Sequence, residues 1–153
     1  MIVSDLTKYL EDFVMTKIVV VLLVVVVGLA VLAHMSSVSA ASAKGEQSLD
    51  PKDALALIQK NKGNSSFVVL DVRTPEEFKE GHIEGAININ YNSGGFKTEV
   101  KELDNKKTYL AYCRSGNRVK GAVTIMRELG FENIIRLNGD MIRWNSEKMP
   151  VVK

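Results

Sequence analysis

The stretch "CRSGNR", Cys113–Arg118, contains the residues whose types and spacing best suit chemistry. Cys113 is the only cysteine of the chain and directly follows the apolar run "TYLAY". Gly116 permits tight turns that point several backbone N–H groups inward, and the helix expected next adds its positive end. Arg114 and Arg118 bring permanent positive charge. Because such surroundings favour a thiolate, Cys113 is predicted to be a nucleophile that needs no general base.

A buried packing residue is the alternative interpretation of Cys113, because free cysteine is among the most buried residue types. A single cysteine forms no internal disulfide, so oxidative pairing does not explain its presence. A glycine and two arginines within five residues of the sulfur favour the functional interpretation.

The elements that must position this loop alternate between strands and helices. The end of a strand is expected at 48–49, and strand-like runs are expected at 66–72, 85–90, 107–113 and 132–140. Helical patterns are expected at 50–63, 74–82, 96–104, 118–130 and 141–150. Asp50 and Thr74 are predicted N-caps, each followed by a proline at the first helical position. This alternation predicts an α/β fold with a mainly parallel sheet, whose carboxyl edge binds ligands and includes Cys113.

The N-terminal part differs from the rest of the chain. Residues 18–33 form an apolar run of 16 residues without a polar side chain. Small residues follow, with "VSA" ending at Ala40 and "ASA" ending at Ala43, as at signal-peptide cleavage sites. A membrane-spanning helix needs about 20 apolar residues. We therefore interpret residues 1–43 as a signal peptide or, if uncleaved, a membrane anchor, and 44–153 as the folded domain.

The charge pattern suggests that the true start is Met15. Residues 1–14 carry three acidic residues, whereas a start at Met15 places Lys17 beside the apolar run. A cationic start is typical of signal peptides, and positive charge marks the inner side of the membrane. Whether the leader is cleaved or retained, residues 44–153 are expected to be exported, in the periplasm or on the outer face of the cytoplasmic membrane.

Charge and histidine content narrow the function classes. Residues 44–153 hold 18 Lys+Arg and 15 Asp+Glu, interleaved along the chain, which argues against nucleic acid as a partner. His34 lies in the leader, so His82 is alone in the domain. A single histidine does not suggest a metal site, and we interpret it as a turn residue bonded to the backbone.

Three motifs resemble, in order and separation, the signatures of rhodanese domains, which are sulfurtransferases. They are "LDVRTPEEFKEGHIEGAINI" (Leu70–Ile89), "CRSGNR" (Cys113–Arg118) and "LNGDMIRW" (Leu137–Trp144). The resemblance covers roughly 49–151 and implies a three-layer α/β fold, with a sheet of about five strands flanked by helices. One departure is Asp140, which follows Gly139 where these proteins often have a Gly-Gly pair. We expect Asp140 at the rim of the site, where it would affect substrate preference.

The resemblance implies a reaction. In rhodaneses the loop cysteine takes the outer sulfur of a donor such as thiosulfate, becomes a persulfide and passes the sulfur to cyanide or a thiol. Cys113 would be this nucleophile, and the arginines would attract the anionic donor and steady the departing sulfite. The substrate-binding loop would consist of Arg114, Ser115, Gly116, Asn117 and Arg118. The resemblance requires no metal or organic cofactor, and its partners are a small anionic sulfur donor and a thiol or cyanide acceptor.

Two other functions remain open. The same thiolate would serve a non-enzymatic persulfide carrier or sensor that hands sulfur to one protein. Cysteine phosphatases and arsenate reductases also use a cysteine loop that ends in arginine. Phosphatase loops resemble C-x5-R, whereas four residues separate Cys113 from Arg118 here. The shorter loop makes a smaller cradle, suited to a sulfur atom, so sulfur transfer is preferred.

Asp71 and Arg73 end the strand-like run "VVLDV" and share the predicted sheet edge with Cys113. We interpret them as supporting residues in a buried ion-pair network. In this hypothesis Arg73 pairs with Glu77, and Asp71 binds backbone at the start of the next helix. Trp144 is predicted to be a core residue. The loop from Tyr91 to Phe96 gives a weak signal for a cover over the pocket.

Overall fold

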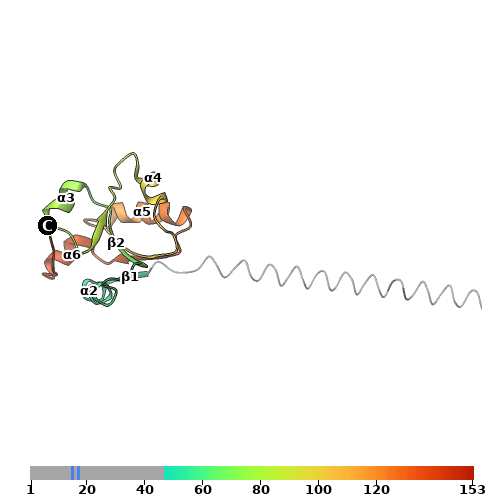
Figure 1. Cartoon of the computed structure of the whole chain (residues 1–153), viewed down its shortest axis with the longest axis horizontal. Helices are drawn as coiled ribbons and strands as arrows, with labels where there is room; N and C mark the ends of the chain where they lie inside the picture. Colours follow the sequence, from blue (N-terminus) through green and yellow to red (C-terminus); the bar gives the residue numbers. More distant parts are fainter. Residues whose placement is uncertain (1–14, 16, 18–46) are drawn as a thin grey trace, which may run out of the picture. The chain divides into compact units, whose positions relative to one another are not determined.

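The computed structural model describes Met15, Lys17 and residues 47–153. The leader predicted at 1–43 lies outside the described residues, apart from Met15 and Lys17. Within the described part of the chain, no helix is long and apolar enough to cross a membrane. Residues 47–153 form one compact unit (Figure 1).

Five parallel strands form one sheet in the order β1-β5-β4-β2-β3. Their bounds are β1 Gln47–Leu49, β2 Phe67–Asp71, β3 Ala86–Asn88, β4 Thr108–Tyr112 and β5 Asn133–Leu137. This confirms the α/β fold, and all pairings within the described sheet are parallel rather than mainly so. The central strand β4 is buried from Tyr109 to Tyr112, which explains its unbroken apolar run.

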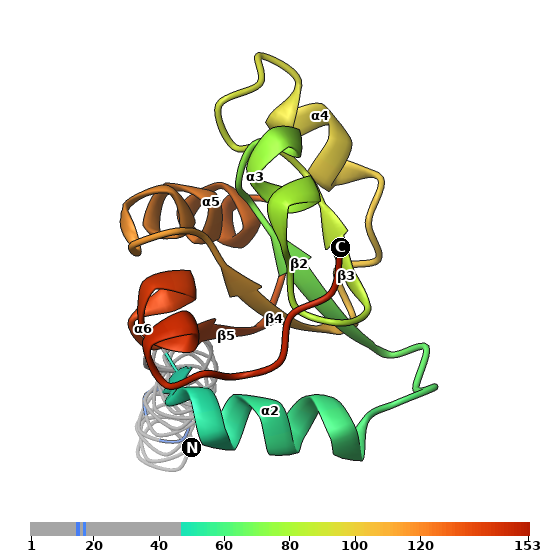
Figure 2. The ribbon, with the colours of Figure 1, turned by 90° about the vertical axis from the view of Figure 1, so that its left-hand side faces the viewer.

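Helices cover both faces of the sheet and give the expected three layers. They are α2 Pro51–Lys60, α3 Pro75–Glu80, α4 Phe96–Lys101, α5 Asn117–Glu128 and α6 Asp140–Ser146. Side chains of α4 and α5 pack in one core cluster, and those of α2 and α6 pack in another. The ribbon shows α5 and α2 on opposite sides of the sheet (Figure 2). Trp144 of α6 is fully buried, and its indole Nε1 donates to the Pro150 carbonyl at 3.0 Å. The prediction that Trp144 is a core residue is confirmed.

The two predicted N-caps behave differently. Thr74 forms a complete capping box, in which its hydroxyl accepts the Glu77 N–H and the Glu77 carboxylate accepts the Thr74 N–H. Asp50 occupies the N-cap position of α2, but its side chain makes no cap hydrogen bond. Its carboxylate instead binds the guanidinium of Arg143 at 2.6 Å. Bonds between charged groups are stronger than a bond to a neutral amide, which explains the exchange.

Candidate active site

Cys113 follows the last residue of β4, at the carboxyl edge of the central strand. Its Sγ accepts the backbone N–H of Gly116 at 3.1 Å, and the residue is 1% exposed. Gly116 has φ 94° and is the N-cap of α5. A β-carbon there would lie 3.2 Å from Asp140 Oδ2, so the position needs glycine for its conformation and for space. The loop turns a backbone N–H toward the sulfur, as predicted.

The structure brings the predicted binding residues into one short loop that enters α5. The exposed members are Arg114, Ser115 and Asn117. Gly116 is buried beneath them, and Arg118 is half-buried on the first turn of α5. This loop therefore presents one arginine to the solvent and directs another to the interior.

Arg118 binds a carboxylate that sequence reasoning did not assign to it. Its Nη1 and Nη2 donate to Glu77 Oε2 and Oε1 at 2.5 and 2.8 Å. These hydrogen bonds lower the pKa of Glu77 to about 2. Glu77 in turn raises the pKa of Arg118, with a smaller contribution from the sulfur of Cys113. The charge of Arg118 thus acts mainly on Glu77 and more weakly on the predicted nucleophile.

The prediction that Arg73 pairs with Glu77 is wrong. Arg73 Nη2 donates to Asp71 Oδ2 at 2.7 Å and to the Gly81 carbonyl at 2.7 Å. Arg73 precedes the helix start at Pro75, so it does not share a helical face with Glu77, and its side chain folds back onto the buried Asp71. Asp71 Oδ1 also accepts the Arg73 N–H at 2.8 Å, which confirms the predicted bond to backbone near the helix start.

The expectation that Asp140 lies at the rim of the site is also wrong, because Asp140 contacts the nucleophile. Its Oδ1 accepts the Cys113 backbone N–H at 2.6 Å. Asp140 is 2% exposed. Burial raises its pKa, while the bonds from Cys113 and the charges of Arg136 and Arg118 oppose that rise.

The pairing of β4 with β5 gives the reason for this contact. Residues that follow two neighbouring parallel strands meet at the same sheet edge. Two backbone N–H groups of α6 confirm the proximity, since Met141 donates to the Cys113 carbonyl and Ile142 to the Arg114 carbonyl. Knowledge of the strand order, together with the departure from Gly-Gly, would have identified Asp140.

The other residues considered in the sequence, His82 and the loop from Tyr91 to Phe96, make contacts that support the fold. His82 Nδ1 lies 3.0 Å from the Phe78 carbonyl, which confirms the predicted bond to backbone. His82 is not a turn residue, however, because it forms an antiparallel β-bridge with Val152. Tyr91 contacts Phe96 edge-on and packs against the core cluster below α5. A cover formed by the loop between them stays a prediction. Among the described residues, no group of three histidine, cysteine or acidic side chains is placed to hold a metal ion.

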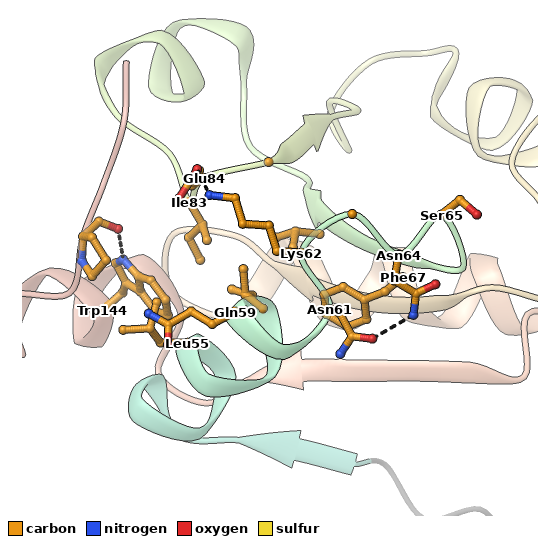
Figure 3. Close-up of a pocket in the computed structure, with 15 residues that line it drawn as sticks. Leu55, Gln59, Asn61, Lys62, Asn64, Ser65, Phe67, Ile83, Glu84 and Trp144 are labelled. Carbon is orange, nitrogen blue, oxygen red and sulfur yellow. Dashed lines mark hydrogen bonds and ion pairs between the residues drawn. The ribbon is translucent and has the colours of Figure 1, made fainter.

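A cavity of about 550 Å³ lies away from this loop (Figure 3). Side chains of α2 and β2, including Leu55 and Phe67, line it together with Ile83. An exposed ion pair between Lys62 and Glu84 lies at its border. No residue from 113 to 118 lines the cavity, so the candidate chemistry belongs to the loop and not to this hollow.

Comparisons with known proteins agree with the site. The family model of the Rhodanese-like domain matches residues 50–147. A mitochondrial protein of Schizosaccharomyces pombe is 32% identical over 56% of this chain and 68% of its own length. YtwF of Bacillus subtilis is 33% identical over 62% of this chain and 89% of its own length. The names of both include sulfurtransferase.

A solved structure shows the same fold. The rhodanese-related protein of Thermoplasma volcanium superposes with a TM-score of 0.57 at 32% identity, covering 69% of this chain and 97% of that protein. Together with the relatives, it supports a sulfurtransferase-like role. Because the family match spans well over half of the sequence, including the cysteine loop, the chain belongs to the family of rhodanese-like domains.

Proposed function

We propose that this domain moves sulfane sulfur from thiosulfate or a persulfide donor to cyanide or a thiol. The observation that best supports this proposal is the position of the Cys113 sulfur, which accepts the Gly116 N–H at the start of α5. The same N–H group and the positive helix end would stabilise the negative charge of a persulfide. The names of the relatives support sulfur transfer in general, and thiosulfate and cyanide are the finer part of the proposal.

The reaction divides into two transfers. The Cys113 thiolate attacks the outer sulfur of thiosulfate, the sulfur–sulfur bond of the donor breaks, and sulfite leaves with the bonding pair. Cyanide or a thiolate then attacks the outer sulfur of the persulfide. With cyanide, the products are thiocyanate and the regenerated Cys113 thiolate.

Intact-mass measurement of the purified full chain tests this proposal. We expect thiosulfate to add one sulfur atom at Cys113, and cyanide to remove it as thiocyanate. No gain of sulfur, while iodoacetamide still alkylates the thiol, would contradict the proposal. A persulfide that neither cyanide nor glutathione discharges would instead support the carrier or sensor function.

We also propose that the domain acts outside the cytoplasm. The support is the apolar run at 18–33 and the small residues that follow it up to Ala43. Fusion of residues 1–46 to a phosphatase that folds only after export should give enzyme activity in intact cells. Absence of phosphatase activity, with the fusion protein present in the cells, would contradict export. The mass of the fusion distinguishes a cleaved leader from an anchor.

A further inference from the structure

We infer that Asp140 sets the donor class of this domain and favours a monoanionic persulfide over the dianionic thiosulfate. This inference rests on the proposed sulfur transfer and concerns the same site.

The backbone at Asp140 is unusual for a residue with a side chain. Its φ is 53°, and Gly139 before it has φ 76°. Glycine adopts such angles freely, whereas other residues adopt them at a cost, although aspartate tolerates them better than most. A non-glycine residue held in this region is often part of a functional site. The carboxyl group is therefore the feature of this position that requires explanation.

The carboxyl group faces the cysteine loop. Oδ1 lies 2.6 Å from the Cys113 nitrogen, and the Cys113 side chain acts to lower the pKa of this carboxyl group. Oδ2 faces Gly116, as shown by its 3.2 Å distance from the position of a β-carbon there. Since Asp140 is 2% exposed, water screens its charge little. A negative charge thus lies beside the sulfur that must receive an anionic donor.

Arg118 and Arg136, two of the arginines around the loop, already interact with carboxylates. Both terminal nitrogens of Arg118 bind Glu77, and the charge of Arg136 acts on Asp140. The attraction that Arg118 offers to a donor is therefore partly offset. Repulsion from Asp140 acts twice as strongly on a dianion as on a monoanion at the same distance. This electrostatic balance disfavours thiosulfate relative to a persulfide anion.

The proton balance favours the same donor. In the proposed step, one proton passes from the Cys113 thiol to the neighbouring Asp140 carboxylate as the sulfur attacks. With a donor R–S–S⁻, the Cys113 sulfur bonds to the outer sulfur and the donor's sulfur–sulfur bond breaks. R–S⁻ leaves with the bonding pair and takes this proton from Asp140 as R–SH. Cys113 then carries S–S⁻ and Asp140 is a carboxylate. Sulfite leaves as a stable anion without being protonated. The proton from Asp140 therefore speeds sulfur transfer from thiosulfate less than transfer from a persulfide.

Donor preference tests the inference. We would measure kcat/KM with glutathione persulfide and with thiosulfate, using cyanide as acceptor, for the wild type, Asp140→Asn and Asp53→Asn. Asparagine keeps an oxygen that can accept the Cys113 N–H but removes the charge and the proton. Asp53→Asn is the matched control, because Asp53 is exposed on α2.

We expect the wild type to prefer the persulfide. Asp140→Asn should raise the ratio of thiosulfate kcat/KM to persulfide kcat/KM by about tenfold or more. A tenfold change is the effect of an interaction that shifts a pKa by about one unit. Asp53→Asn should leave the ratio unchanged. An unchanged ratio in Asp140→Asn, or equal losses with both donors, would overturn the inference. Asp140→Gly, which relieves the backbone strain, should shift the ratio in the same direction if Asp140→Asn folds poorly.

Alkylation of Cys113 separates this inference from the proposed function. Iodoacetate is anionic and iodoacetamide is neutral, so the ratio of their rates reports the local charge without any sulfur transfer. Asp140→Asn should raise the iodoacetate-to-iodoacetamide ratio, and an unchanged ratio would overturn the inference even in an active enzyme. The wild type could fail to transfer sulfur from either donor while Asp140→Asn still raises the iodoacetate-to-iodoacetamide ratio. That result would overturn the proposed sulfur transfer and the donor preference, but it would support the charge effect of Asp140 on Cys113.

Discussion

Glu77 and Arg118, 41 residues apart, form a two-point ion pair that joins α3 to the first turn of α5. The same Glu77 carboxylate closes the capping box of Thr74. Through these bonds the start of α3 is fixed relative to the cysteine loop. The Glu77 side chain is 25% exposed and that of Arg118 is 19% exposed, so the pair is only partly screened by water.

Glu77→Gln should make the stability of the domain less dependent on acid. The ordinary pKa of 4.5 falls to about 2 in the folded protein, so the stabilisation is complete above about 4.5 and disappears as the pH falls through about 2. We expect the pair to contribute about 1 kcal/mol to the free energy of unfolding, because it is partly exposed. Urea unfolding at pH 6 and near pH 2 measures the difference between wild type and variant.

The difference should be present at pH 6 and vanish near pH 2. Glu80→Gln is the matched control, since Glu80 is an exposed glutamate of the same helix. An equal difference at both pH values would show that Glu77 stabilises the fold through packing rather than charge.

Arg118→Ala should raise the KM for thiosulfate at least about tenfold, because it removes a guanidinium next to Cys113. It should also lower the free energy of unfolding by about 1 kcal/mol, since Glu77 loses its partner. The double variant Glu77→Gln/Arg118→Ala should be about as stable as either single variant, because the same ion pair is lost only once, and should keep the raised KM. An unchanged KM in Arg118→Ala would remove Arg118 from donor binding.

The sequence pattern was sufficient to predict the helices, the strands and the cysteine loop, because all of them depend on local features. Apolar runs, the prolines after Asp50 and Thr74, and Gly116 are each readable within a few residues. Helix bounds were less accurate; the pattern at 50–63 continues past the end of α2 at Lys60, through a turn at Asn61–Gly63.

The partners of charged side chains could not be predicted in the same way. Arg73 and Glu77 are four residues apart, which suggested a helical pair, but Arg73 lies outside α3 and binds Asp71. Glu77 binds Arg118 instead, across a separation that only the strand order determines. Asp140 contacts Cys113 for the same reason, since β4 and β5 are neighbours.

Arg73→Leu should destabilise the domain by about 3–5 kcal/mol, the usual effect of leaving a buried charge without its partner. Asp71 is fully buried, and Arg73 is 6% exposed. The double variant Asp71→Asn/Arg73→Leu should recover part of this loss, because the neutral amide needs no counter-ion. Urea unfolding measures both variants, and equal destabilisation of the two would argue against the charge-pair explanation.

Cys113→Ser should abolish sulfur transfer and leave the fold intact. The hydroxyl oxygen can accept the Gly116 N–H in place of the sulfur, and the Cys113 backbone bond to Asp140 needs no side chain. Serine is slightly smaller than cysteine, so we expect a loss of free energy of unfolding below about 1.5 kcal/mol at this buried site. A serine hydroxyl, however, is a poor nucleophile without an adjacent base. Intact mass after treatment with thiosulfate tests the loss of sulfur transfer, and thermal unfolding tests whether the fold is retained. A gain of sulfur by the folded variant would exclude Cys113 as the sulfur acceptor.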